Sequence, residues 1–187
     1  MTSGYTGRHL TVIACAAGPA TDVAALVKAA LADGWGVNVI ATPDAVSFMD
    51  IPALEDLSSA PVRSQPRVPG TPSMRTIRPA DALIVAPATF NSINKLAAGI
   101  VDTYALTVIA EAIGAGTPVV IVPFVNAALA SRLPYRLSLR QLRDEGVRVI
   151  EGRADDWVPH PPGTGATRQR DFPWQHAIAE ARRLAAR

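Results

Sequence analysis

The sequence contains little cysteine, few aromatic residues and almost no excess of charge of either sign. Its one cysteine, Cys15, excludes an internal disulfide and a cysteine-rich zinc site, which fits a reducing compartment, and we expect no metal site. The net charge of +2 includes no dense basic cluster and does not favour nucleic-acid binding. No apolar run reaches the roughly 18 residues of a membrane-spanning helix, and the N-terminus does not resemble a secretion signal. These absences predict a cytoplasmic protein that binds neither nucleic acid nor a membrane.

Two glycine-rich nucleotide motifs are also missing. Neither the GxGxxG spacing of dinucleotide folds nor a Walker pattern occurs, so a nicotinamide cofactor or a nucleoside triphosphate is not supported. Hydrophobic residues are abundant. They make up 49% of the 187 residues, whereas 18% are charged, and the hydrophobic excess is in Ala and Val. At this length the composition predicts one domain over residues 1–187, with either a packed α/β core or an oligomer interface taking up the apolar excess.

Short apolar runs alternate with helical patterns along the chain. Continuous apolar, β-branched runs predict buried strands at 9–15, 37–41, 82–86, 118–122 and 147–150. Periodic apolar positions predict helices at 21–33, from about 91, at about 135–145 and at about 173–184. This alternation predicts an α/β fold, Rossmann-like with three α/β/α layers, around a parallel sheet of about five to six strands.

Three segments fall outside the alternation. Residues 1–8 are polar, and we expect them to form a flexible lead. Residues 58–79 contain five prolines and predict a long loop that is either functional or mobile, which leaves open whether it acts as a lid. Residues 151–187 form a C-terminal extension with a turn-rich stretch around His160 and a closing helix.

Ligands of an open parallel sheet bind beyond the carboxyl ends of its strands, so the loops after Cys15, Ala41 and Ala86 are the candidate site. The first loop is small and suits either a ligand or a tight turn. The third loop is more specific, because it combines a proline turn, two hydroxyls and a side-chain amide where a strand becomes a helix. Free amides at such a helix start suit a phosphate or a ring carbonyl, and the alternative is that these side chains only cap the helix. The third loop is Pro87-Ala88-Thr89-Phe90-Asn91-Ser92.

This loop resembles a motif of the homo-oligomeric flavin-containing cysteine decarboxylases, Pro-Ala-Ser-Ala-Asn-Thr followed by Lys, Gly-Ile and Asp. The residues that coincide are Pro87, Ala88, Asn91, Lys95, Gly99, Ile100 and Asp102. Upstream, the family's Thr-Pro-Ala-Ala and a following Phe resemble Thr42-Pro43-Asp44-Ala45 and Phe48, and its small-residue loop resembles Ala16-Ala17-Gly18. After the fourth strand, Pro123 and Asn126 remain from the family's Pro-x-Met-Asn-x-x-Met-Trp signature. The resemblance covers about residues 9 to 150.

The resemblance implies bound FMN and a decarboxylase, a lyase that oxidises the cysteine of its substrate to a thioaldehyde before carbon dioxide leaves. The residues implied for FMN are Ala17, Gly18, Thr42, Phe48, Pro87, Ala88, Thr89, Phe90, Asn91 and Ser92. Asn91 is also implied as a catalytic residue that contacts the flavin or the substrate. The Asn126 amide would hold the substrate carboxylate, and the alternative is that Asn126 is another helix cap. The implied substrate is a small molecule or a peptide C-terminal carboxylate, and the implied assembly is a homo-oligomer, a trimer or a dodecamer.

One departure concerns histidine. The family has a histidine base shortly before the aspartate that opens the third strand, and Ser73 stands at that position here. Of the histidines in this chain, His160 is the one in a loop that could return to the site, and its alternative is a solvent-exposed turn. An FMN-dependent decarboxylase is the favoured prediction. The alternatives are a non-catalytic flavin-binding or regulatory subunit, and an FMN-dependent enzyme on another acid or a relative of the flavin prenyltransferases.

Overall fold

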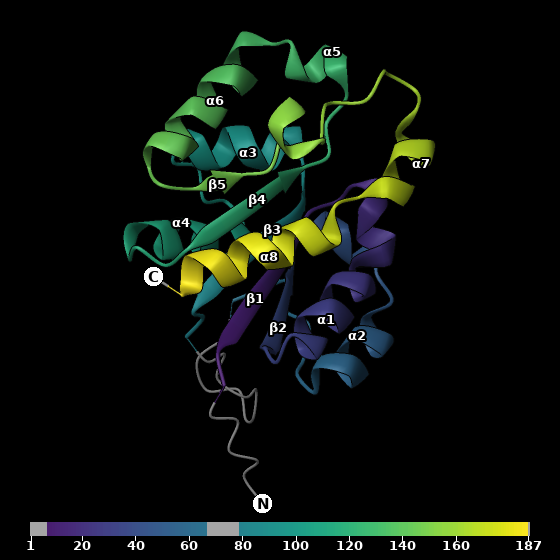
Figure 1. Cartoon of the computed structure of the whole chain (residues 1–187), viewed down its shortest axis with the longest axis vertical. Coiled ribbons are helices and arrows are strands. Elements are labelled where there is room, and N and C mark those ends of the chain that lie inside the picture. The colour runs from purple at the N-terminus through teal and green to yellow at the C-terminus, as the bar shows by residue number, and fades with distance from the viewer. Residues whose placement is uncertain (1–6, 67–78, 187) are drawn as a thin grey trace, which may run out of the picture.

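Five parallel strands form the centre of the molecule in a computed structural model that describes residues 7–66 and 79–186. They lie in the order β2-β1-β3-β4-β5, so the chain builds outward from β1 first to one side and then to the other (Figure 1). The predicted sheet is confirmed, and each predicted strand is present with its bounds shifted by one or two residues. The strands are β1 (His9–Ala14), β2 (Gly36–Ala41), β3 (Ala82–Ala88), β4 (Val119–Pro123) and β5 (Arg148–Val149).

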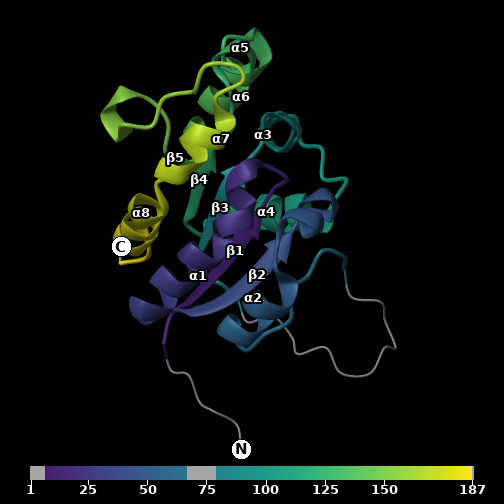
Figure 2. The same ribbon diagram turned by 90° about the vertical axis from the view of Figure 1, so that its right-hand side faces the viewer.

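Helices cover both faces of this sheet, which confirms the three-layer arrangement (Figures 1 and 2). One layer contains α1 (Val23–Ala32), α2 (Ile51–Ser58) and α8 (Trp174–Ala185). The opposite layer contains α3 (Phe90–Ala97), α4 (Tyr104–Gly114) and α6 (Leu133–Asp144). Short helices follow the strand ends and the C-terminal segment: η1 (Gly18–Asp22), η2 (Pro43–Phe48), α5 (Ala127–Ala130), η3 (Arg153–Asp155), α7 (Gly165–Arg168) and η4 (Gln169–Asp171).

The strands read as continuous apolar runs because both of their faces are buried. On β1, Leu10 and Val12 belong to the core beneath α1 and α8, whereas Ile13 belongs to the core beneath α3, α4 and α6. All three side chains are fully buried. Removal of such apolar surface from water is the main term that stabilises the sheet between its helices.

The helix predicted from about Asn91 is followed by a second helix, and the two are separated by a short break. After α3, Gly99 has φ +72°, a left-handed conformation that glycine adopts at no steric cost, and a new helix begins at Tyr104. An ion pair bridges this break, with Lys95 Nζ 2.6 Å from Asp102 Oδ2. The family-like Lys, Gly-Ile and Asp positions therefore shape one turn between two helices.

Part of the predicted proline-rich loop pairs with the edge of the sheet. The segment begins where α2 ends, at Ser58. Arg63 then forms a parallel bridge with Ile40, since its N–H donates to Val39 O at 3.1 Å and its carbonyl accepts from Ala41 N at 2.8 Å. Residues 67–78, with the Ser73 position, and residues 1–6 of the expected lead lie outside the described residues.

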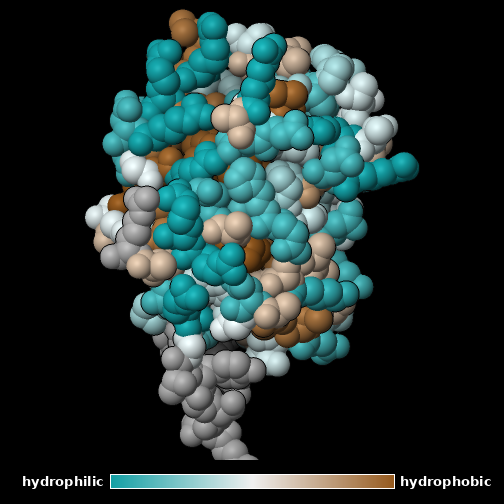
Figure 3. Space-filling model, in the orientation of Figure 1, coloured by the Kyte–Doolittle hydropathy of each residue, from teal (hydrophilic) through white to brown (hydrophobic). Residues whose placement is uncertain are grey.

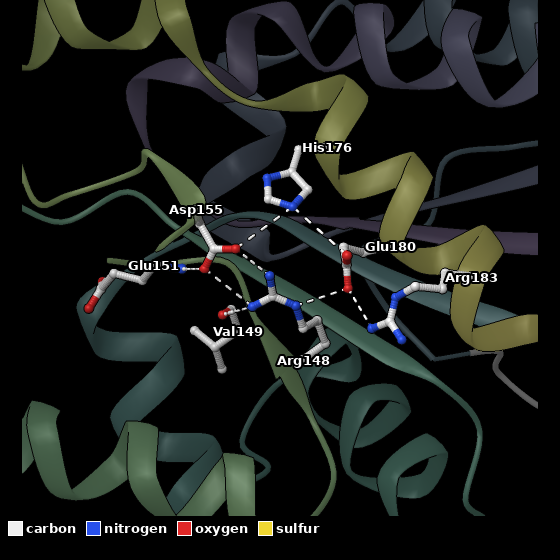
Figure 4. A network of polar contacts seen from close by, with 7 residues as sticks. All are labelled: Arg148, Val149, Glu151, Asp155, His176, Glu180 and Arg183. Atoms are coloured by element: carbon white, nitrogen blue, oxygen red, sulfur yellow. Dashed lines mark hydrogen bonds and ion pairs between the residues drawn. The ribbon is translucent and has the colours of Figure 1, made fainter. Parts of the chain in front are cut away.

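The C-terminal segment is tied to the sheet by charge. Figure 4 shows Arg148 of β5 between two carboxylates, an ion pair with Asp155 on η3 and a second, 2.9 Å from Nε to Oε2, with Glu180 on α8. Arg183 also binds Glu180 at 2.7 Å, and His176 Nε2 lies 3.7 Å from Asp155 Oδ1. α8 thereby crosses over β3 and β4, as Figure 1 shows.

The surface over α8 is mainly hydrophilic, with separate small apolar patches (Figure 3). Of the described helices, none has the length and apolar character that crossing a bilayer requires. The exposed large apolar side chains come from several elements: Val46, Phe48, Ile100, Val101, Leu129, Leu133, Leu137 and Val158.

Candidate functional site

A cavity of about 710 Å³ opens at the carboxyl edge of the sheet. Its walls come from the loops after β1, β2, β3 and β4 and from the C-terminal segment. Because the strand order reverses between β1 and β3, this is the topological switch point at which open α/β sheets bind ligands. The lining residues are Ala16, Ala17, Gly18, Thr42, Pro43, Asp44, Thr89, Phe90, Asn91, Ser92, Lys95, Asp102, Thr103, Leu106, Phe124, Val125, Asn126, Leu129 and His160.

The loop after β1 is both a tight turn and a pocket wall. Ala17 N–H donates to Cys15 O and its carbonyl accepts from Ala20 N, each at 2.8 Å, which closes the turn. A Cβ on Gly18 would meet the end of the Gln169 side chain, which would have to move aside, so the C-terminal segment approaches this loop closely. Both interpretations of this loop, a tight turn and a ligand wall, therefore describe the same residues.

The loop after β3 presents unpaired backbone donors to the cavity. Thr89 is the N-cap of α3: its hydroxyl accepts from Ser92 N at 3.2 Å and lies 2.9 Å from Ser92 Oγ. Ile93 N–H donates to Thr89 O at 3.0 Å and starts the helical pattern. The N–H groups of Phe90 and Asn91, at the first two helical positions, precede that pattern and have no intrahelical acceptor. Within residues 7–66 and 79–186 neither N–H group has a hydrogen-bond acceptor, so the positive end of α3 faces the pocket with two donors.

Two asparagines of α3 have different roles. The Asn94 amide is committed within the fold, since Nδ2 donates to Phe90 O and Oδ1 accepts from Ser138 Oγ, both at 2.8 Å. Asn91 is exposed, lines the cavity and has no side-chain hydrogen bond to another described residue. Asn91 is therefore not the helix cap, and its amide is available to a ligand.

Three of the predicted cofactor residues do not line the cavity. Pro87 and Ala88 are buried, and their carbonyls accept from Cys15 N at 3.0 Å and from Phe124 N at 2.8 Å, so they hold the neighbouring loops in place. Phe48 ends η2 with 39% of its surface exposed and lies outside the cavity lining. The cavity does bring together Ala17, Gly18, Thr42, Thr89, Phe90, Asn91 and Ser92.

Asn126 caps α5 and also lines the cavity. Its Oδ1 accepts from Leu129 N at 3.0 Å, so the helix-cap interpretation is correct for the oxygen. An amide has a separate NH₂ group with two donors, and this group is left over once the oxygen is used by the cap. The cap fixes the amide orientation and leaves Nδ2 as the atom that can meet a carboxylate.

His160 reaches the cavity from the C-terminal segment. Its carbonyl accepts from Ala127 N at 2.7 Å, and the ring lies 4.9 Å from the ring of Phe124, centroid to centroid. The ring is half-buried and lines the cavity. His160 therefore belongs to the cavity wall, while His176 lies in the Arg148 network.

Several lining residues escaped prediction as site residues. Lys95 and Asp102 coincide with the family motif, but the sequence assigned them no role. In the structure they form an ion pair that lines the cavity. Asp44 also stood in a family-like motif, after Pro43. Phe124 stands at an unspecified position of the family signature, and no local pattern signals that its ring packs against His160.

Two buried groups lie behind the cavity wall. Burial raises the pKa of the Cys15 thiol, against the opposing effect of hydrogen bonds with the Ser92 side chain and the Thr89 backbone, so the thiol is neutral. Tyr135 stacks on Phe90 with ring centroids 5.6 Å apart and donates to Glu151 Oε2 at 2.5 Å. Burial, and next the Glu151 carboxylate, raise the pKa of Tyr135, which keeps the hydroxyl protonated as a donor.

The donor set suits a planar, phosphorylated ligand. Free helix-start amides and nearby hydroxyls are typical phosphate partners. The aromatic side chains Phe90 and Phe124 offer faces to a planar ring system.

Comparisons with known proteins agree with this geometry. The model of the flavoprotein family matches residues 2–169. Over 77 residues, 41% of this chain, the chain is 36% identical to the coenzyme A biosynthesis bifunctional protein CoaBC of Thermococcus kodakarensis. Over 64 residues, 34% of the chain, it is 34% identical to the dihydromethanopterin reductase (acceptor) of Methanosarcina mazei. These matches span 19% and 27% of the length of those two proteins.

Solved structures resemble the chain over nearly its whole length. The FMN-dependent cysteine decarboxylase TvaF from thioviridamide biosynthesis is 27% identical, with a TM-score of 0.69 over 96% of this chain and 99% of TvaF. The cypemycin decarboxylase CypD, at 21% identity, has the same fold, with a TM-score of 0.69 over 97% of this chain and 96% of CypD. The family model covers most of the chain, and the fold agrees with it, so the predicted resemblance is confirmed: the chain belongs to the flavoprotein family.

Proposed function

We propose that this protein is an FMN-dependent decarboxylase, a lyase that acts on a cysteine-containing carboxylic acid. The observation that carries the proposal is the switch-point cavity, in which the free amides of Phe90 and Asn91 lie with the uncommitted NH₂ group of Asn126. The first pair suits a phosphate and the second group suits a carboxylate. The full-length similarity to TvaF, an FMN-dependent cysteine decarboxylase, supports the same activity.

The residues around the cavity fit FMN. The backbone amides of Phe90 and Asn91 and the turn at Ala17 and Gly18 would hold it, together with the hydroxyls of Thr42, Thr89 and Ser92. The Thr89 and Ser92 hydroxyls already contact each other, yet each oxygen has a further lone pair. Bound FMN would supply the two-electron oxidant that no protein side chain here provides.

Asn126 would orient the substrate by its carboxylate. Since the α5 cap holds its Oδ1, Nδ2 cannot exchange places with the oxygen, and the site presents a donor to an anionic group. This geometry suits either a small acid or the C-terminal carboxylate of a peptide. We further propose a cytoplasmic homo-oligomer, a trimer or a dodecamer, which would cover exposed apolar side chains such as Phe48, Ile100 and Val101.

The cavity favours an enzyme over a non-catalytic subunit. A subunit that only holds flavin has no need for a carboxylate donor or an imidazole, yet Asn126 and His160 both line this cavity. No lining residue specifically favours an enzyme on another acid or a flavin prenyltransferase.

The test begins with the visible spectrum of the purified protein, before and after incubation with FMN. The protein is then mixed anaerobically with phosphopantothenoylcysteine or with a peptide that ends in cysteine. We expect flavin bleaching and carbon dioxide release with at least one of them, and neither with a matched peptide that ends in serine. A protein that takes up no FMN refutes the cofactor, and one that holds FMN but reacts with neither thiol refutes the decarboxylase.

A further inference from the structure

The segment after β5 holds an imidazole at the cavity through fixed contacts. Trp157, 4% exposed, donates from Nε1 to Pro123 O at 2.8 Å, and its ring stacks on Phe124 at 6.4 Å between centroids. Phe172 packs against both rings, at 5.3 Å and 6.1 Å. Between these anchors, the His160 backbone forms a parallel bridge with Asn126, the N-cap of α5, and its ring lies on Phe124. The ring position is therefore determined by backbone pairing as well as by aromatic packing.

A backbone carbonyl selects the tautomer of this ring. His160 Nδ1 lies 3.0 Å from Pro161 O. A carbonyl only accepts hydrogen bonds, so Nδ1 carries the proton, and the neutral ring has its lone pair on Nε2. Gly165 lies close to this edge of the ring, since a Cβ there would be 3.7 Å from Nε2, and it places no side chain against it.

The other ionisable side chains around the cavity are less suited to take a proton. Lys95 and Asp102 bind each other, and Asp44 is a carboxylate, a class of much weaker bases than imidazole. The charged groups on the elements packed beside His160 are Arg168 of α7 and Asp171 of η4, which pair with each other at 3.9 Å. Within the described lining, His160 is thus the side chain whose chemistry matches a general base.

We propose that His160 Nε2 accepts the proton of the substrate thiol during oxidation, an inference that rests on the proposed function. The S–H bond breaks, and its proton moves to Nε2 while its electron pair stays on sulfur. That pair forms the second carbon–sulfur bond as hydrogen on the adjacent carbon leaves as hydride to the flavin oxidant. The substrate loses two electrons and becomes a thioaldehyde, and the imidazolium later returns its proton to water.

Two substitutions separate a base from a packing ring. His160→Phe keeps an aromatic ring against Phe124 without a lone pair, and His160→Gln keeps polarity without an imidazole. His176→Gln is the matched control, because it makes the same change on α8 outside the cavity. The holoenzymes are compared by anaerobic flavin reduction across pH, with flavin content measured for each. The ring tautomer is read independently by nitrogen NMR of the wild-type protein.

We expect kcat/KM to fall by about 10²- to 10⁴-fold in both His160 variants, with FMN content unchanged. The loss of activity at acidic pH that marks an essential base should disappear in them and persist in His176→Gln. Full activity in His160→Phe overturns the proposal, as does loss of FMN from both variants or an NMR signal from protonated Nε2 and bare Nδ1. A wild-type protein that holds FMN but oxidises no thiol overturns the proposed function and this inference together, whereas an active wild type with active variants overturns this inference alone.

Discussion

Asn126→Asp separates the two tasks of one side chain. The aspartate keeps an oxygen where Oδ1 accepts from Leu129 N, and Asp caps helices about as well as Asn. It replaces the NH₂ group by a second oxygen, so the donor to the substrate carboxylate is lost and like charge is introduced. A hydrogen bond to a charged group contributes about 1.5–3 kcal/mol. At 1.36 kcal/mol per tenfold change, KM should rise by about 10- to 150-fold, with repulsion adding to this.

The assay is anaerobic flavin reduction as a function of substrate concentration, with thermal unfolding measured on the same samples. Asn126→Asp should keep its FMN and its melting temperature. Asn126→Ala loses the cap as well, at about 0.5–2 kcal/mol, and each kcal/mol lowers the melting temperature by roughly 2–4 °C in a chain of this size. An unchanged KM in a flavin-loaded Asn126→Asp enzyme would refute the reasoning and leave Asn126 as a helix cap alone.

Other predictions follow from single contacts. Asn91→Asp places a carboxylate beside the free amides of α3 and should raise the FMN dissociation constant at least about tenfold by flavin fluorescence, because it repels the phosphate; retention equal to wild type would contradict this. Trp157→Phe leaves a buried carbonyl at the end of β4 without its donor, and urea unfolding should show a loss of about 1–3 kcal/mol. Hydrogen bonds from Arg183 and then from Arg148 lower the pKa of Glu180 below its ordinary 4.5 (Figure 4). The Glu180 carboxylate therefore stabilises the fold above pH 4.5, and this contribution is lost as the pH falls through the lowered pKa. Urea unfolding of Glu180→Gln should therefore differ from wild type at neutral pH and approach it in acid, and a constant difference would count against the linkage.

The sheet could be predicted because each strand carries its own signal. A run such as residues 82–86 is apolar at every position, and burial on both faces is what such a run requires. The helix break at Gly99 was harder to predict, because a single left-handed glycine leaves the apolar pattern around it ambiguous. The helix α2 was harder to predict because it is short and has a proline in its first turn. The bridge at Arg63 depends on the edge of β2 and has no local signature.

The site was predictable to the extent that it is local. Thr89, Asn91 and Asn126 act at the ends of strands and the starts of helices, where chemistry and chain geometry are both set by neighbours in sequence. The aromatic contact between Phe124 and His160 joins residues far apart in the chain, so only the fold reveals it. Phe48 shows the converse: its motif suggested a cofactor contact, but η2 leaves its side chain outside the cavity lining.

The segment between Trp157 and Phe172 is held at both ends by buried rings, and most residues between them are exposed. His160 is the residue of that stretch that lines the cavity, so substitutions at the other positions leave the sheet and the start of α3 unaltered. The segment between Trp157 and Phe172 can therefore be exchanged while the buried rings at its two ends stay in place. Libraries confined to residues 158–164, with His160 retained, should therefore leave expression and flavin loading close to those of the parent protein.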